Sequence, residues 1–89
     1  MIEGLTVGRI VHYVLDAGRC KGDHRPAIVV RDWKQENGLC QLQVFTDGSN
    51  DGFLIDGDVS NASANAIWRT SVHYSETHEL GTWHWPERV

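Results

Sequence analysis

The chain has 89 residues, the length of one small domain, so we expect a single domain over residues 1–89 with one compact core. The chain has eight Lys and Arg and twelve Asp and Glu, and the net charge of −4 disfavours the binding of long nucleic acid, which needs a basic surface. No apolar run approaches the roughly 18 residues that cross a membrane, and no leader pattern is visible, so we expect an intracellular protein without membrane contact.

The first predicted strand covers residues 7–15. One of its faces carries Val7, Val11, Tyr13 and Leu15, because side chains alternate along an extended chain, and β-branched residues are frequent in it. The next strand, residues 26–33, is apolar on both faces at its centre. This pattern predicts the most buried strand of the fold.

A tight hairpin follows. Asn37-Gly38 is a strong turn signal, so the second strand should pair antiparallel with a third strand over residues 39–46. In that third strand Cys40, Leu42 and Val44 alternate with glutamines, which predicts an apolar face turned to the core and a half-solvated outer face.

The second half of the chain is less regular. Residues 47–65 are rich in Gly, Asp, Asn and Ser and predict a long connection, in which residues 53–55 form a short strand or a packing staple. Residues 67–74 alternate again and predict a strand, with Trp68 in the core.

The last predicted strand is the aromatic segment 83–85. Alternation places Trp83 and Trp85 on one face and His84 on the other, and Pro86, which has no N–H to donate, ends the strand. Five or six short strands with turn signals between them, and helix content near a single turn, predict an all-β fold: a small antiparallel barrel.

Five histidines and two cysteines are enough to hold a metal ion. Cys20-x3-His24 together with Cys40 could supply three zinc ligands, but no Cys-x2-Cys pair is present, and surface histidines are commoner than ligands. We therefore expect no metal, no cofactor and reduced thiols. Ser71 and His73 share a strand face without a nucleophile motif around them, so we expect no enzyme.

Arginines on or beside the predicted strands, together with aromatic side chains, favour a small anionic ligand. An arginine fork binds phosphate, and an aromatic face stacks on a base, which together suit a nucleotide with few phosphates. Plain packing is the competing interpretation, with Tyr13 in the core and Arg31 merely solvated. The residues that we expect to contact such a nucleotide are Arg9, Tyr13, Arg25, Arg69, Trp83, His84 and Trp85.

Residues 7–14, Val-Gly-Arg-Ile-Val-His-Tyr-Val, and residues 81–87, Gly-Thr-Trp-His-Trp-Pro-Glu, resemble the two ends of a family of short proteins common in bacteriophage genomes. The resemblance implies a phage origin, a small SH3-like barrel and a location in the cytoplasm of the infected bacterial host. Similarly sized phage proteins include sponges, usually oligomers, that sequester nucleotide signals of bacterial immunity. The expected function is therefore capture of a small anionic nucleotide, plausibly a cyclic second messenger, by a homo-oligomer.

Two alternatives remain open. The chain could be a phage structural or protein-interaction module, in which segment 83–85 is the contact patch. Residues 22–30 are also similar to the Arg-Pro-Ala-Val-Val segment of PemK/MazF-type RNA-cleaving toxins, which have an SH3-like barrel. That similarity implies an endoribonuclease with Arg25 in the position of the catalytic arginine.

Overall fold

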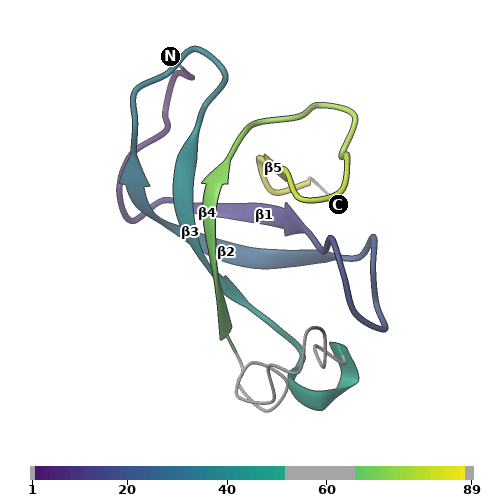
Figure 1. Cartoon of the computed structure of the whole chain (residues 1–89). Helices are drawn as coiled ribbons and strands as arrows, with labels where there is room; N and C mark the ends of the chain where they lie inside the picture. The colour runs from purple at the N-terminus through teal and green to yellow at the C-terminus, as the bar shows by residue number, and fades with distance from the viewer. Residues whose placement is uncertain (1, 52–65, 88–89) are drawn as a thin grey trace.

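The computed structural model describes residues 2–51 and 66–87, and these form one antiparallel sheet of five strands (Figure 1). The all-β prediction is confirmed. In space the strands follow the order β4-β3-β2-β1-β5. The elements are β1 (Ile10–Val14), β2 (His24–Asp32), β3 (Cys40–Phe45), the 3-10 turn η1 (Gly48–Asp51), β4 (Ala66–Val72) and β5 (Trp83–His84).

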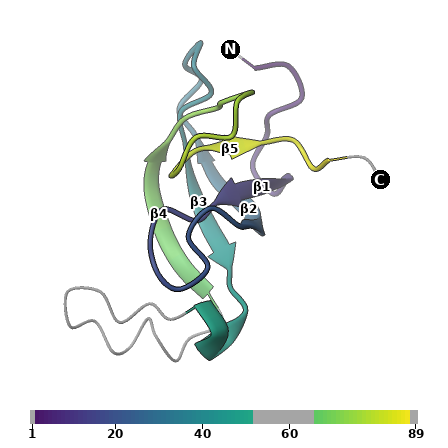
Figure 2. The same ribbon diagram turned by 90° about the vertical axis from the view of Figure 1, so that its right-hand side faces the viewer.

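The sheet is strongly twisted. In Figures 1 and 2, β1 lies across the direction of β3 and β4, as the right-handed twist of successive strands requires. Beyond β4, a single parallel bridge between Tyr74 and Trp83 joins the chain to β5. Closure into an SH3-like barrel stays a prediction. Within residues 2–51 and 66–87, no helix has the length and apolar character needed to span a membrane.

The core lies on one face of the sheet. Val11, Tyr13 and Leu15 are buried as the alternation predicts, and so are Cys40, Leu42 and Val44 of β3. Trp83 is the largest fully buried side chain, and its indole N–H donates to the carbonyl of Gly38 at 2.8 Å. A buried tryptophan needs such an acceptor, so the last strand is tied to the turn between β2 and β3.

Two of the predicted strands differ from the observed ones. The first strand begins at Ile10 and not at residue 7, so Val7 precedes it and is exposed instead of sharing the face of Val11. The second begins at His24 and is not the most buried, because Val30 on its outer face is 44% exposed. Alternation from the buried Ala27 and Val29 turns Val30 outward, and a register shift between Val29 and Arg31 leaves Arg31 exposed as well.

The β4 prediction was wrong about which face is inside. Ile67 is buried, whereas Trp68 is 47% exposed. Leu42 pairs with Arg69 but Cys40 pairs with Val72, so β4 carries one extra residue, and Ser71 within this bulge has a φ of 55°. The bulge resets the alternation, which is how Ile67 and Val72, five positions apart, both reach the core. The 3-10 turn agrees with the expected single helical turn, and the predicted segment 53–55 lies outside the described residues.

Gly38 is the tightest point of the β2–β3 turn. Its φ is +71°, and a Cβ there would lie 2.8 Å from Ile2 Cγ1, 2.9 Å from Trp83 Cζ2 and 3.1 Å from the Cβ of Tyr74. The residue must therefore be glycine both for its backbone conformation and for space.

We expect Gly38→Ala to lower the free energy of unfolding by about 2–5 kcal/mol, because left-handed strain of about 1–2 kcal/mol adds to overpacking of about 1–3 kcal/mol. Gly8→Ala is the matched control, since Gly8 has a φ of +90° but nothing within 4 Å of the added carbon. Urea denaturation of both variants separates the two effects. Equal losses in the two variants would show that the packing around Trp83 accommodates the methyl group.

Candidate metal centre

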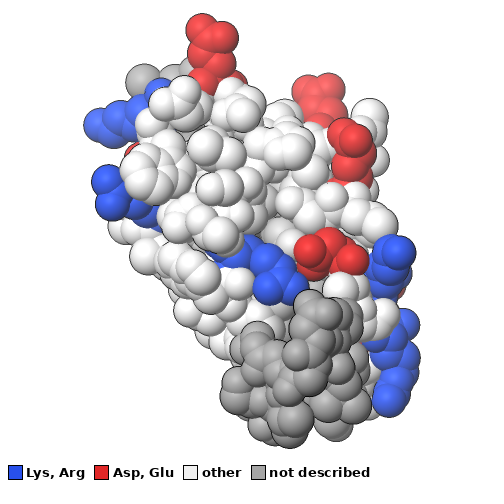
Figure 3. Space-filling view, in the orientation of Figure 1, with Lys and Arg blue, Asp and Glu red and all other residues white. Residues whose placement is uncertain are grey.

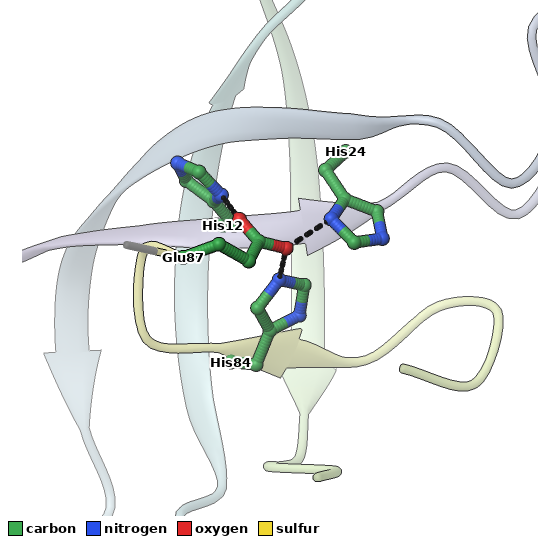
Figure 4. Close-up of side chains that lie close together, drawn as sticks. All are labelled: His12, His24, His84 and Glu87. Carbon is green, nitrogen blue, oxygen red and sulfur yellow. Dashed lines mark hydrogen bonds and ion pairs between the residues drawn. The ribbon is translucent and has the colours of Figure 1, made fainter. Parts of the chain in front are cut away.

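Three histidines and one glutamate converge on the outer side of the sheet. They are His12, His24, His84 and Glu87, and one ligand atom from each lies within 4.8 Å of all the others. Figure 4 shows the three imidazole rings pointing toward the carboxylate of Glu87. Among residues 2–51 and 66–87, this is the one group of three or more such side chains close enough to hold a metal ion.

Strand pairing places the histidines. His12 of β1 faces His84 of β5 in register, one position beside the pair of Tyr13 and Trp83. Because Tyr13 and Trp83 point into the core, both histidines must point to the opposite face. β2 lies on the other side of β1, where its first residue, His24, pairs with Val14 and shares the outer face.

Glu87 supplies the fourth group. Its Oε1 lies 2.5 Å from Nε2 of His84 and contacts Nδ1 of His24, while its Oε2 lies 2.5 Å from Nδ1 of His12. The carboxylate thus occupies the centre of the three-histidine face. Its two oxygens meet nitrogens from three separate strands.

The pKa values of Glu87 and His84 suit a metal ligand set. Desolvation alone would raise the pKa of Glu87, but hydrogen bonds from its own backbone N–H and from the three imidazoles outweigh it and lower the pKa to about 2. Burial is the largest effect on His84 and lowers its pKa, although Glu87 opposes this. The pair is therefore held as carboxylate and neutral imidazole, which are the forms that bind metal ions.

A fourth imidazole lies beside the cluster. The ring of His78 stacks on that of His84, with 3.7 Å between centroids and 22° between planes, and its edge meets His24 at 5.0 Å. His84 is 3% exposed, and its Nδ1 is a buried atom without a hydrogen-bond partner in the described structure. His78 thus covers one side of the cluster.

Three imidazole nitrogens and a carboxylate oxygen form a complete tetrahedral ligand set. In such a site, bonds of about 2.0–2.2 Å separate neighbouring ligand atoms by about 3.3 Å. The donor atoms lie within 4.8 Å of one another. The Glu87 oxygens stand 2.5 Å from Nε2 of His84 and Nδ1 of His12, so the carboxylate must move back from the imidazoles to leave room for an ion. Imidazole and carboxylate donors suit Zn²⁺ best among the common divalent ions with this geometry.

The seven residues predicted to contact a nucleotide do not form one site. Tyr13 and Trp83 are core residues, and burial raises the pKa of Tyr13 to about 12. Arg69 donates to the Tyr13 hydroxyl at 3.2 Å and pairs with Asp16 at 3.3 Å. His84 belongs to the outer cluster, on the opposite face of the sheet from Tyr13.

Arg25 has a structural partner. Its guanidinium makes a two-pronged contact with the fully buried Asp51, at 3.0 Å from Nε and 2.7 Å from Nη2. The hydrogen bonds from Arg25 are the largest effect on Asp51 and lower its pKa. The backbone N–H of Asp47 donates to the same carboxylate at 2.8 Å, so this arginine fixes η1 to β2.

Arg9 and Trp85 contact each other, with the guanidinium 5.0 Å from the ring centroid. Arg31, expected to be merely solvated, stacks on Trp33 at 4.0 Å. This stack borders an open groove of about 720 Å³. The groove is lined by Val7, Val30, Arg31, Asp32, Trp33, Gln41 and Trp68. On the face shown in Figure 3, basic and acidic side chains are interspersed, both at the margin and near the middle, and neither kind gathers into a continuous patch.

The zinc ligand set considered from the sequence is not assembled. Cys40 is fully buried, and desolvation raises the pKa of its thiol to about 12. Cys20 donates to the carbonyl of Asn50 at 3.5 Å. Of that set, only His24 belongs to the cluster, and within the described part of the chain neither cysteine joins a group of potential ligands.

Sequence reasoning missed His12, His24 and Glu87 as partners of His84. The alternation did place His84 on the other face of its strand from Trp83, and His12 on the other face of its strand from Val11 and Tyr13. A signal was therefore present: two histidines on the non-core face of strands at opposite ends of the chain. Alternation within each strand does not show that these two strands are neighbours in the sheet.

No protein-family model, curated protein or solved structure matches this chain.

Proposed function

We propose that this protein is a small β domain that binds one divalent transition-metal ion, Zn²⁺, through His12, His24, His84 and Glu87. The observation that carries the proposal is the convergence of four potential ligand atoms within 4.8 Å. Two of the histidines come from adjoining strands, and the third comes from a strand more than 70 positions further along the chain than His12.

The ligand set favours a structural over a catalytic metal ion. Catalytic zinc sites have three protein ligands and leave the fourth position to water, whereas structural sites are filled by the protein. Here Glu87 fills the fourth position. A bound ion would join β1, β2 and β5, of which β5 is a strand of only two residues.

We expect the metal-free protein to bind one equivalent of Zn²⁺ in calorimetric titration, and His12→Ala to weaken this binding at least about 100-fold, because loss of a direct ligand exceeds the 10–100-fold cost of outer-shell changes. At 100 times its dissociation constant, Zn²⁺ adds ~2.7 kcal/mol to the free energy of unfolding. For a domain of this size, that raises the melting temperature by roughly 10–20 °C.

His73→Ala is the matched control. His73 is an exposed histidine outside the cluster, so its loss removes one imidazole from the chain without touching the proposed ligands. Binding that weakens equally in the His12 and His73 variants would indicate adventitious zinc on surface imidazoles and would contradict the proposed centre.

Zinc affinity should fall steeply as the pH decreases. Imidazole must lose its proton to bind, and the ordinary histidine pKa is about 6.5, so protons compete with the metal below that pH. Glu87, with a pKa of about 2, stays ionised across the range. We therefore expect full affinity at pH 7.5 and a loss of more than about tenfold per pH unit below pH 6, measured by competition with a chelator. A flat profile would show that imidazoles are not the ligands.

A second candidate function is capture of a small anionic nucleotide, proposed from the residue chemistry and the phage resemblance. One observation favours it, at a different place from the residues first nominated. The Arg31–Trp33 stack and the exposed Trp68 border the same open groove, which puts a guanidinium and two indoles within reach of one planar ligand. Such a protein would act in the cytoplasm of an infected bacterium, as a homo-oligomer.

For this second function, we expect one cyclic dinucleotide, cyclic trinucleotide or ADP-ribose-derived signal to raise the melting temperature by roughly 10–20 °C at 100 times its dissociation constant. Trp68→Ala should abolish that shift, because each stacked base contributes ~1–3 kcal/mol. Phe45→Ala is the control, since Phe45 is similarly exposed but does not line the groove. No shift with any compound of the panel would contradict nucleotide capture.

A further inference from the structure

We infer that Glu87 is an exchangeable ligand, and that the metal-loaded three-histidine face accepts a carboxylate from another molecule in its place. The inference rests on the proposed metal centre and adds a ligand class to it. The three histidines belong to strands of the sheet, whereas Glu87 lies outside it.

The three histidines are fixed by the sheet. His12 and His84 face each other across the β1–β5 ladder, and their ring centroids are 5.7 Å apart. His24 belongs to the adjoining strand, with its centroid 4.5 Å from that of His84. Their backbones are held by ladder hydrogen bonds, so the three-nitrogen face exists independently of Glu87.

Glu87 lies outside the sheet. The β1–β5 ladder ends at His84, and Pro86 has no N–H with which to extend it. Among the described residues, the backbone of 85–87 makes no hydrogen bond to another strand. Trp85 is the last residue of this segment that packs on the core, with its ring edge-on to that of Trp83 at 5.0 Å. Rotation of the backbone at Pro86 and Glu87 would therefore be enough to move the Glu87 side chain away from the histidines.

The opening that Glu87 would leave faces solvent. Its side chain is 38% exposed, whereas His84 beneath it is almost fully buried and His78 covers the neighbouring side. An incoming ligand would therefore enter along the direction from which Glu87 now enters.

Charge and shape select a carboxylate. A divalent ion on three neutral imidazoles carries two positive charges, and exchange of one carboxylate for another leaves the total charge of the centre unchanged. Glu87 also shows how the face receives this group, with Oε1 against His24 and His84 and Oε2 against His12. The tethered carboxylate competes at an effective concentration on the order of mM, so a free carboxylate meets an internal competitor.

The test uses the full chain loaded with Co²⁺, whose visible absorption changes when a ligand is exchanged. Wild-type protein and Glu87→Ala are each titrated with acetate, and with azide as a non-carboxylate anion. We expect Glu87→Ala to retain Co²⁺ and to respond to acetate at a concentration at least tenfold lower than the wild type does. Glu87→Gln, which keeps the side-chain volume, serves as the second variant should the alanine variant fold poorly.

The outcomes separate the two proposals. Loss of Co²⁺ from both Glu87 variants while the wild type binds it would make Glu87 an obligatory ligand and overturn the exchange, leaving the metal centre intact. If the Glu87 variants respond to acetate no better than the wild type does, or not at all, the exchange is also overturned. If they respond to azide alone, the choice of a carboxylate as the incoming ligand is wrong. Failure of the wild type itself to bind Co²⁺ would remove the metal centre, and the inference with it.

Discussion

The register between β1 and β5 is the constraint on which the rest of this structure depends. It sets Tyr13 opposite Trp83 and His12 opposite His84. Because alternate residues point to opposite faces, one pairing builds an aromatic core on one side and brings two potential metal ligands together on the other. A slip of one residue would exchange the two sets, burying imidazoles and exposing the largest core side chain. Core and candidate centre are therefore specified together.

Two further contacts hold this register. The indole N–H of Trp83 donates to the carbonyl of Gly38, in a turn where any side chain would displace the ring. On the other side of the ladder, β2 keeps β1 in place and contributes His24, while its neighbour Arg25 is held by Asp51. The candidate centre thus lies on strands that are fixed by contacts made elsewhere, which is what a preorganised ligand set requires.

Local patterning predicted most of the fold and little of the site. The alternation correctly placed Val11, Tyr13, Leu42 and Val44 in the core, because period-two burial is visible within one strand. It was wrong for Trp68, because one extra residue near Ser71 reverses the faces and a bulge has no reliable local signature. The cluster was beyond such reasoning, since it depends on the spatial adjacency of the first and last strands. Glu87 was the hardest member of the cluster to predict, because the alternation of a strand does not continue after Pro86.

A metal ion bound at the proposed centre would cross-link the short β5 to β1. His12 and His84 stand 72 positions apart, 84 less 12, so an ion bound to both closes most of the chain into a loop. A cross-link over a loop of that length restricts the unfolded ensemble by an entropy worth about 4 kcal/mol, as a disulfide would. The two thiols of this chain are both free. A metal ion would thus serve as a reversible staple between the ends of the fold, strong where zinc is plentiful and removable where it is scarce.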